Sequence, residues 1–168
     1  MVQGFGLLDK TVLIFDKAFW PPGSDFVMRQ ATDLSGRWST FLSFQRLLGA
    51  PVLVALHSAD TARMLEGMTY PEVVSDAMRV LRSMYPNAPQ PKETRVTRWA
   101  ADPYALGSYS YFAVGNPKNI TALIAEPFGR VLFAGEATSD KPATVLGAHL
   151  SGLREAARVT SLLGSPAQ

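Results

Sequence analysis

Short apolar runs separated by turns that contain Gly and Pro dominate the N-terminal half of the chain. The first is Thr11-Val-Leu-Ile-Phe15, which is β-branched or apolar throughout and therefore predicts a strand buried on both faces. The segment Phe19-Trp20-Pro21-Pro22-Gly23 ends it. Similar runs occupy residues 25–30, 40–45 and 51–57. The spacing of these four segments predicts an antiparallel sheet.

Two helices are predicted directly after the last of these runs. The first covers residues 59–66. The second begins after Thr69, because Thr69 and Glu72 have the spacing of a capping box, in which each side chain bonds the other residue's backbone amide. Its apolar positions then recur at helical intervals: Val74, Ala77, Met78, Leu81 and Met84.

The C-terminal half mixes irregular and regular segments. A strand is predicted at residues 93–99, an irregular aromatic segment at 102–115 and a short helix at 119–125. A last strand at 130–134 precedes a long helix at 142–163, whose predicted inward positions are Leu146, Leu150, Leu153 and Ala157. The predicted fold class is therefore α/β, with an α+β region followed by one more strand and one more helix.

Composition indicates a folded protein and excludes several classes of function. The chain has 168 residues, of which 47% are hydrophobic and 18% charged, so it can bury a core. Its net charge of +2 comes without any run of like charges, which argues against nucleic-acid binding. Cysteine is absent and only His57 and His149 could offer imidazole, so no metal site is expected. No stretch is long and apolar enough to predict a membrane span, and no signal peptide is evident, so a cytoplasmic location is expected.

The segment most informative about chemistry begins at Val131. The apolar run Val131-Leu-Phe-Ala stops at Gly135 and is followed by one carboxylate, Glu136, and by a helix with Pro142 near its start. A strand, a tight turn and a helix N-terminus together suit a polyhydroxy, anionic cofactor. On spacing alone, an ordinary strand-turn-helix with a solvated Glu136 is the alternative.

Residues 131–159 resemble the C-terminal FAD-binding segment of the flavin-containing amine oxidases, a family that includes polyamine oxidases and flavin-dependent histone lysine demethylases. The resemblance implies that the Gly135-Glu136 turn binds FAD, with Glu136 accepting a hydrogen bond from a ribityl hydroxyl. It also implies that the amides of Thr144 and Val145 donate to the pyrimidine edge of the flavin, where the reduced ring is anionic.

Residues 95–112 are similar to a second segment of that family. The resemblance places Trp99 near the flavin and Tyr109 in the wall of the substrate cavity, where an aromatic face can hold an alkylammonium group. The alternative is that aromatic side chains here fill a core under a loop, and for Tyr104, Tyr111 and Phe112 we expect that alternative.

Lys10 opens the first apolar run, at the place where the family has a Lys that bonds a water bridging to flavin N5. The resemblance therefore gives Lys10 the catalytic role. The alternative is an exposed Lys at a strand edge, the commoner situation for such a residue. The sequence departs from many amine oxidases at Thr144, which stands where they have a second aromatic residue. The resemblance therefore implies a substrate cage with an aromatic on one side only. Both a small-molecule amine and a peptidyl amine are possible substrates.

The family's Gly-rich dinucleotide fingerprint is not present in the sequence. Gly4 and Gly6 are followed by Asp9 where a third Gly is required, and the segment precedes its strand. The resemblance thus corresponds to the C-terminal part of a full enzyme, with residues 1–128 as the substrate-binding region and 129–168 as the FAD-binding segment of a Rossmann-like domain. The resemblance implies oxidation of a C–H bond next to an amine nitrogen, hydride transfer to FAD and release of peroxide. It also implies that the missing N-terminal FAD-binding half is a required partner, and that the chain alone is inactive. The alternative function is a non-catalytic interaction module that has kept part of the fold.

Overall fold

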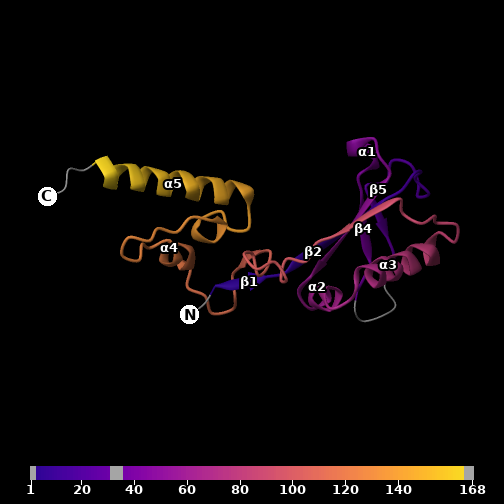
Figure 1. Ribbon diagram of the computed structural model, residues 1–168, viewed down its shortest axis with the longest axis horizontal. Helices are drawn as coiled ribbons and strands as arrows, with labels where there is room; N and C mark the ends of the chain where they lie inside the picture. Colours follow the sequence, from indigo (N-terminus) through magenta and orange to yellow (C-terminus); the bar gives the residue numbers. More distant parts are fainter. Residues whose placement is uncertain (1–2, 31–35, 165–168) are drawn as a thin grey trace. The chain divides into compact units, whose positions relative to one another are not determined.

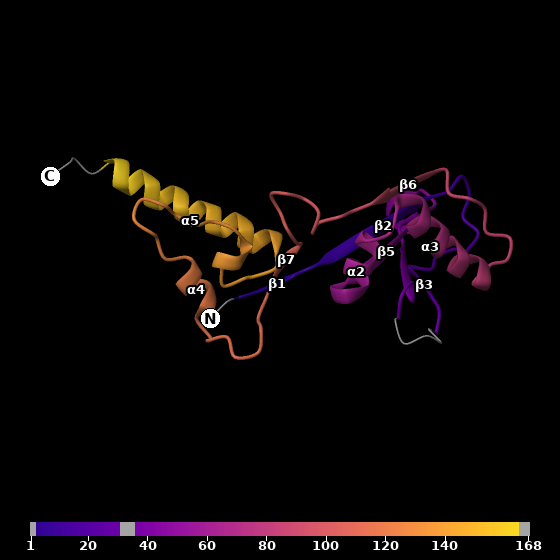
Figure 2. The ribbon, with the colours of Figure 1, turned by 60° about the horizontal axis from the view of Figure 1, so that its bottom comes forward.

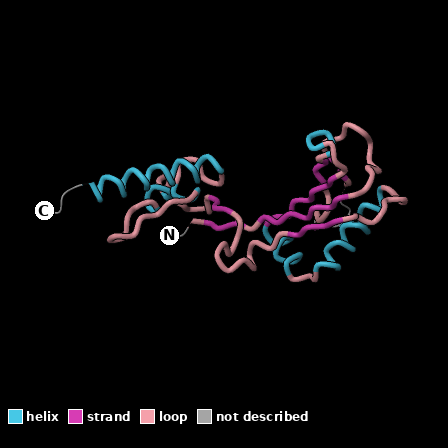
Figure 3. Tube along the Cα trace, turned by 45° about the horizontal axis from the view of Figure 1, so that its top comes forward, coloured by secondary structure: helices cyan, strands magenta, loops and turns pink. Residues whose placement is uncertain are grey.

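The computed structural model describes residues 3–30 and 36–164, which form two compact units (Figure 1). Leu7–Ser108 make up one unit, called here the sheet unit. Met1–Gly6 and Tyr109–Gln168 make up the other, called here the helix unit. The predicted mixture of helices with an antiparallel sheet is confirmed, and Figure 3 shows how the strands and helices are distributed.

The sheet unit is built on a five-stranded sheet in the order β3-β4-β5-β2-β6. All neighbouring strands are antiparallel, as the sequence predicts. The strands are β2 (Leu8–Ile14), β3 (Phe26–Met28), β4 (Thr40–Ser43), β5 (Val52–Ser58) and β6 (Glu93–Val96). Asp9 pairs with His57 and Lys10 with Leu56 in the register of β2 against β5. Because side chains alternate along a strand, Asp9 and Lys10 lie on opposite faces of the sheet.

Two helices, α2 (Ala59–Glu66) and α3 (Tyr70–Met84), cover one face of this sheet (Figures 1 and 3) and lie close to the predicted bounds. A single short turn of helix, α1 (Gln45–Leu48), follows β4. The core between helices and sheet includes Leu13, Phe41, Leu53, Leu65, Ala77 and Leu81, all buried. The expectation that β2 is buried on both faces is wrong: Val12 and Ile14 are only half-buried, because the covered face is the one that holds Thr11 and Leu13.

The capping box predicted before α3 is present. The Thr69 amide and hydroxyl both donate to Glu72 Oε2, at 2.7 Å each, and the Thr69 side chain in turn accepts the Glu72 amide. Pro71 occupies the first turn, where its missing N–H costs nothing. These contacts fix the start of α3 at Tyr70.

The helix unit contains little sheet. Its two short strands, β1 (Gly4–Gly6) and β7 (Tyr109–Tyr111), pair with each other and were not predicted. The other elements are α4 (Ile120–Ile124), the single 3₁₀ turn η1 (Glu136–Thr138) and α5 (Val145–Gly164). Both α4 and α5 contact η1, and Figure 2 shows α5 running alongside the loop that precedes it.

Three expectations for this region are wrong. Residues 130–134 form no strand: a strand needs a hydrogen-bonded neighbour, and among the described residues there is only one bridge, from Phe128 to Val131. The last helix starts at Val145, since Ala143 has a left-handed φ of 58° that ends any helix upstream. The predicted inward leucines of α5 are exposed, and its buried positions are instead Gly147, Ser151 and Glu155.

Candidate flavin-binding site

The turn at Gly135 has an open backbone. Gly135 has a φ of +137°, a conformation that L side chains rarely adopt, and apart from its chain neighbours no described atom lies within 4 Å of the position where its Cβ would stand. The turn η1 then begins at Glu136. A ligand can therefore approach the main chain closely at Gly135, which is what a cofactor cradle requires.

The Glu136 carboxylate is held in place by three donors. Its Oε1 accepts the Ser110 amide at 2.8 Å, and its Oε2 accepts the Ser110 hydroxyl at 2.7 Å and the Ala143 amide at 2.5 Å. Partial burial raises the pKa of Glu136, but the hydrogen bonds from Ala143 and Ser110 outweigh burial and leave the pKa below its usual value. A carboxylate has about four acceptor sites, so Glu136 remains ionised with room for one further donor.

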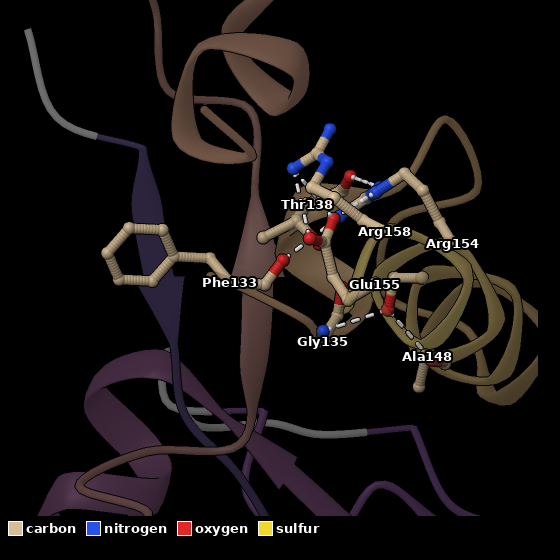
Figure 4. A network of polar contacts seen from close by, with 8 residues as sticks. Phe133, Gly135, Thr138, Ala148, Arg154, Glu155 and Arg158 are labelled. Carbon is tan, nitrogen blue, oxygen red and sulfur yellow. Dashed lines mark hydrogen bonds and ion pairs between the residues drawn. The ribbon is translucent and has the colours of Figure 1, made fainter. Parts of the chain in front are cut away.

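A buried polar network fastens the Gly135 turn to α5 (Figure 4). The Gly135 amide donates to Ser151 Oγ at 2.8 Å. The Arg154 guanidinium donates to the Thr138 carbonyl at 2.7 Å and to the Phe133 carbonyl at 3.0 Å. Glu155, only 6% exposed, accepts from both Arg154 and Arg158, so its buried charge is compensated. The contact between α5 and the turn is therefore polar, which explains why the leucines of α5 point elsewhere.

The N-terminus of α5 is shaped by Thr144. Its Oγ1 accepts the Gly147 amide at 2.9 Å and its hydroxyl donates to the Lys141 carbonyl at 2.7 Å. Gly147 is required for this approach, because a Cβ there would lie 2.0 Å from the Lys141 carbonyl oxygen. The first amides of a helix have no acceptor within the helix, which makes the amide of Val145, the first residue of α5, a candidate donor to a ligand. The Thr144 side chain is thus a helix cap.

Tyr109 lies in β7 and is 39% exposed. Its neighbour Ser110 is buried and bonds Glu136, and it was not among the predicted site residues. The alternation of Tyr109, Ser110 and Tyr111, aromatic outside and small inside, is the period-2 signal that could have revealed this strand and its buried serine.

In the sheet unit, Lys10 and Trp99 are tied to the same polar cluster. The Lys10 amide donates to Thr97 Oγ1 at 2.8 Å, and the Thr97 amide donates to the Lys10 carbonyl at 3.0 Å. The Trp99 amide donates to Asp9 Oδ1 at 3.1 Å. The Lys10 side chain itself is exposed and makes no ion pair within the described residues, so it is available to a ligand or to water.

The expectation that Tyr104, Tyr111 and Phe112 fill a core is wrong. Their exposed fractions are 97%, 52% and 57%. Only the ring of Tyr111 lies against a neighbouring strand in the described residues, where it covers Gly4 of β1. Trp99, 39% exposed, likewise presents part of its ring to the surface.

None of the helices in residues 3–30 and 36–164 is long and apolar enough to cross a membrane.

Comparison with known proteins identifies the family. Residues 2–160 match the family described as flavin containing amine oxidoreductase. Over 97% of its length the chain is 42% identical to a protein of Drosophila melanogaster named possible lysine-specific histone demethylase 1. Over 93% it is 41% identical to lysine-specific histone demethylase 1 homolog 1 of Arabidopsis thaliana, and over 96% it is 36% identical to histone demethylase-like protein A of Aspergillus fumigatus. The chain spans about a fifth of the length of these relatives, 20%, 20% and 16% respectively. With nearly its whole length matched, the chain belongs to the flavin-containing amine oxidoreductase family.

Proposed function

We propose that this chain is part of an FAD-dependent amine oxidase that acts on a lysine side chain within a protein. The observation that carries the proposal is the open turn at Gly135, followed by an ionised Glu136 and by the N-terminus of α5 at Val145, in a chain of this family. When bound, FAD supplies the hydride acceptor for the C–H bond next to the amine nitrogen.

The residues of the helix unit fit the flavin in chemistry. Glu136 retains acceptor capacity for a ribityl hydroxyl. The Val145 amide, with the positive end of a 20-residue helix behind it, is suited to donate to an electron-rich ring edge. Gly135 leaves room for close approach of the cofactor. We further propose that the phosphate end of FAD is bound by a Gly-rich unit outside this sequence.

Three other residues complete the proposal. Trp99 and Tyr109 would offer aromatic faces to the flavin and to the substrate amine. Lys10 would hold the water next to flavin N5 and assist proton movement there. The substrate class rests on the names of the relatives, which refer to lysine-specific histone demethylase 1, and on Thr144, whose small side chain would leave space for a methylated lysine in a peptide.

A chimera with a relative tests the proposal, because the relatives are longer than this chain and also contain segments that this chain does not match. In the chimera this chain replaces the matching segment, 20% of the length, of the Drosophila relative. We expect a yellow protein with bound FAD, which a dimethyl-lysine peptide reduces. The chain alone should bind FAD weakly and remain nearly colourless. A chimera that folds but binds no flavin would favour a non-catalytic module.

Lys10→Met in this chimera should keep FAD bound, since the proposed anchors are Glu136, Thr144 and Val145, while one of the flavin half-reactions slows by about 10²-fold or more. Stopped-flow absorbance measures reduction by the peptide and reoxidation by oxygen separately. Lys92→Met is the control, because Lys92 is an exposed lysine of the same unit paired with Asp16. Wild-type rates in both half-reactions would remove Lys10 from the mechanism.

A further inference from the structure

A buried carboxylate without a full set of partners lies beside the segment that contains Trp99. Asp9 is 3% exposed. Its Oδ1 accepts the Thr97 hydroxyl at 2.7 Å and the Trp99 amide at 3.1 Å. Its Oδ2 is buried and has no hydrogen-bond donor among the described residues. A buried acceptor without a donor lowers the stability of the fold, so we expect Asp9 Oδ2 to have a hydrogen-bond donor.

A candidate for that donor is Glu66, at the end of α2, because Glu66 and Asp9 accept the amides of consecutive residues. Its Oε1 accepts the Ala100 amide at 2.8 Å, so Glu66 holds the residue next to Trp99. Burial is the first cause that raises the pKa of Glu66, and the neighbouring Asp9 carboxylate raises it further, against the lowering effect of the Ala100 amide. Two carboxylates cannot bond each other, but a carboxyl and a carboxylate can.

The other titratable and charged groups around the pair do not supply this proton. His57 pairs with Asp9 in the register of β2 against β5, and burial lowers the pKa of His57 to about 4. Its Nε2 and Asp9 Oδ2 are both without a hydrogen-bond partner among the described residues, so the two atoms do not bond each other. Arg98 directs its guanidinium to the Glu66 and Met68 carbonyls. Arg37 and Asp76 act on His57 with opposite signs.

We propose that Asp9 and Glu66 share one proton and together position the turn that carries Trp99. Glu66 donates its proton to Asp9 Oδ2, and the free acceptors of the pair, Asp9 Oδ1 and Glu66 Oε1, hold the Trp99 and Ala100 amides. Asp9 and Glu66 are therefore positioning residues. Their importance for catalysis rests on the proposed function, in which Trp99 lies beside the flavin; the shared proton itself does not.

Loss of this proton at higher pH leaves both Asp9 and Glu66 negatively charged, so that they repel each other, and removes the donor to Asp9 Oδ2. A carboxyl whose pKa is raised in the folded state stabilises the fold below that pKa and loses the contribution as pH rises through it. The turn should accordingly be tightest below the raised pKa of Glu66 and loosen above it.

The two amides are direct reporters in the 168-residue chain, without flavin. ¹H–¹⁵N spectra recorded across the carboxyl titration range should show the Trp99 and Ala100 signals moving with one common midpoint, above that of an ordinary glutamate. Glu66→Gln, which keeps a donor but cannot titrate, should abolish this step and leave amide exchange slow. Asp9→Ala should speed exchange of the Trp99 amide by about tenfold or more. Glu93→Gln, at an exposed ion-paired carboxylate of β6, is the control.

Separate midpoints for the two amides, or an exchange rate in Glu66→Gln as fast as in Asp9→Ala, would overturn the shared proton. Should Asp9→Ala fail to fold, the common midpoint in the wild type and its loss in Glu66→Gln still decide the matter. Failure of the chimera to bind FAD would refute the proposed function and leave these measurements unaffected.

Discussion

The imidazole of His57 is 5% exposed and lies edge-on against the indole of Trp38, with ring centroids 4.3 Å apart. Burial is the main cause that lowers the pKa of His57 from 6.5 to about 4. Below pH 6.5 the unfolded chain therefore binds a proton that the folded chain does not. The fold should be fully stabilised above pH 6.5 and lose stability as the pH falls toward 4.

His57→Leu should remove this acid sensitivity. In the wild type, the free energy of unfolding should fall by about 3 kcal/mol between pH 6.5 and 4 because of His57 alone. Urea denaturation at a series of pH values measures the slope, and His149→Leu is the control because His149 is exposed. A slope that persists in His57→Leu and disappears in His149→Leu would contradict this account.

At the scale of single elements, α5 offers two glycines with opposite expectations. A Cβ at Gly147 would meet the Lys141 carbonyl oxygen at 2.0 Å, whereas a Cβ at Gly152 would meet nothing within 4 Å. Gly147→Ala should destabilise by about 2 kcal/mol, since backbone has to move. Gly152→Ala should stabilise by up to about 1 kcal/mol through helix propensity. Thermal melts of both variants compare them, and equal effects would mean that α5 does not pack on the Ser139–Lys141 turn.

The two longer helices of the sheet unit differ in how they begin. Thr69→Ala removes a capping box and should cost about 1 kcal/mol. Ser58→Ala should change stability by less than about 0.5 kcal/mol, because Ser58 precedes α2 but makes no capping hydrogen bond. Chemical denaturation of the pair measures the difference. A cost at Ser58 as large as at Thr69 would show that propensity, and not the bond, sets the effect.

At the scale of the whole molecule, apolar burial is uneven. The hydrophobic cluster lies entirely within Leu7–Ser108, and of the apolar side chains described as buried only Ile120 belongs to the helix unit. The helix unit instead relies on buried polar groups such as Ser110, Ser151 and Glu155. Polar networks add little net stability compared with apolar burial.

Residues 7–108 expressed alone should therefore unfold in one cooperative transition, which circular dichroism can follow. In the whole chain, native-state hydrogen exchange should show slow amides in β2 and β5 and faster amides in α5. Equal protection in β5 and α5, or the absence of a transition in the isolated unit, would contradict the division of stability between the two units.

Local signals in the sequence determined much of the sheet unit. The capping pair Thr69 and Glu72 and the helical spacing after it placed α3, and short apolar runs placed β2 and β5, because such signals act between residues a few positions apart. The Gly135-Glu136 turn and the presence of a helix after it could also be predicted, since the segment is short and continuous, whereas the strand at 130–134 and the helix start at 142 were wrong. The resemblance to amine oxidases agrees with the family match.

Only the tertiary structure decided which groups meet across long distances in the sequence. Asp9 bonds Thr97, 88 residues away, and Ser110 bonds Glu136, 26 residues away; no local pattern encodes either partner. The buried face of α5 could not be predicted from its apolar stripe. The leucines of that stripe lie on an exposed face, whereas Ser151 and Glu155 make the polar contacts that bury the other face. Periodicity tells which residues share a face of a helix, and the partner that covers a face is fixed by packing.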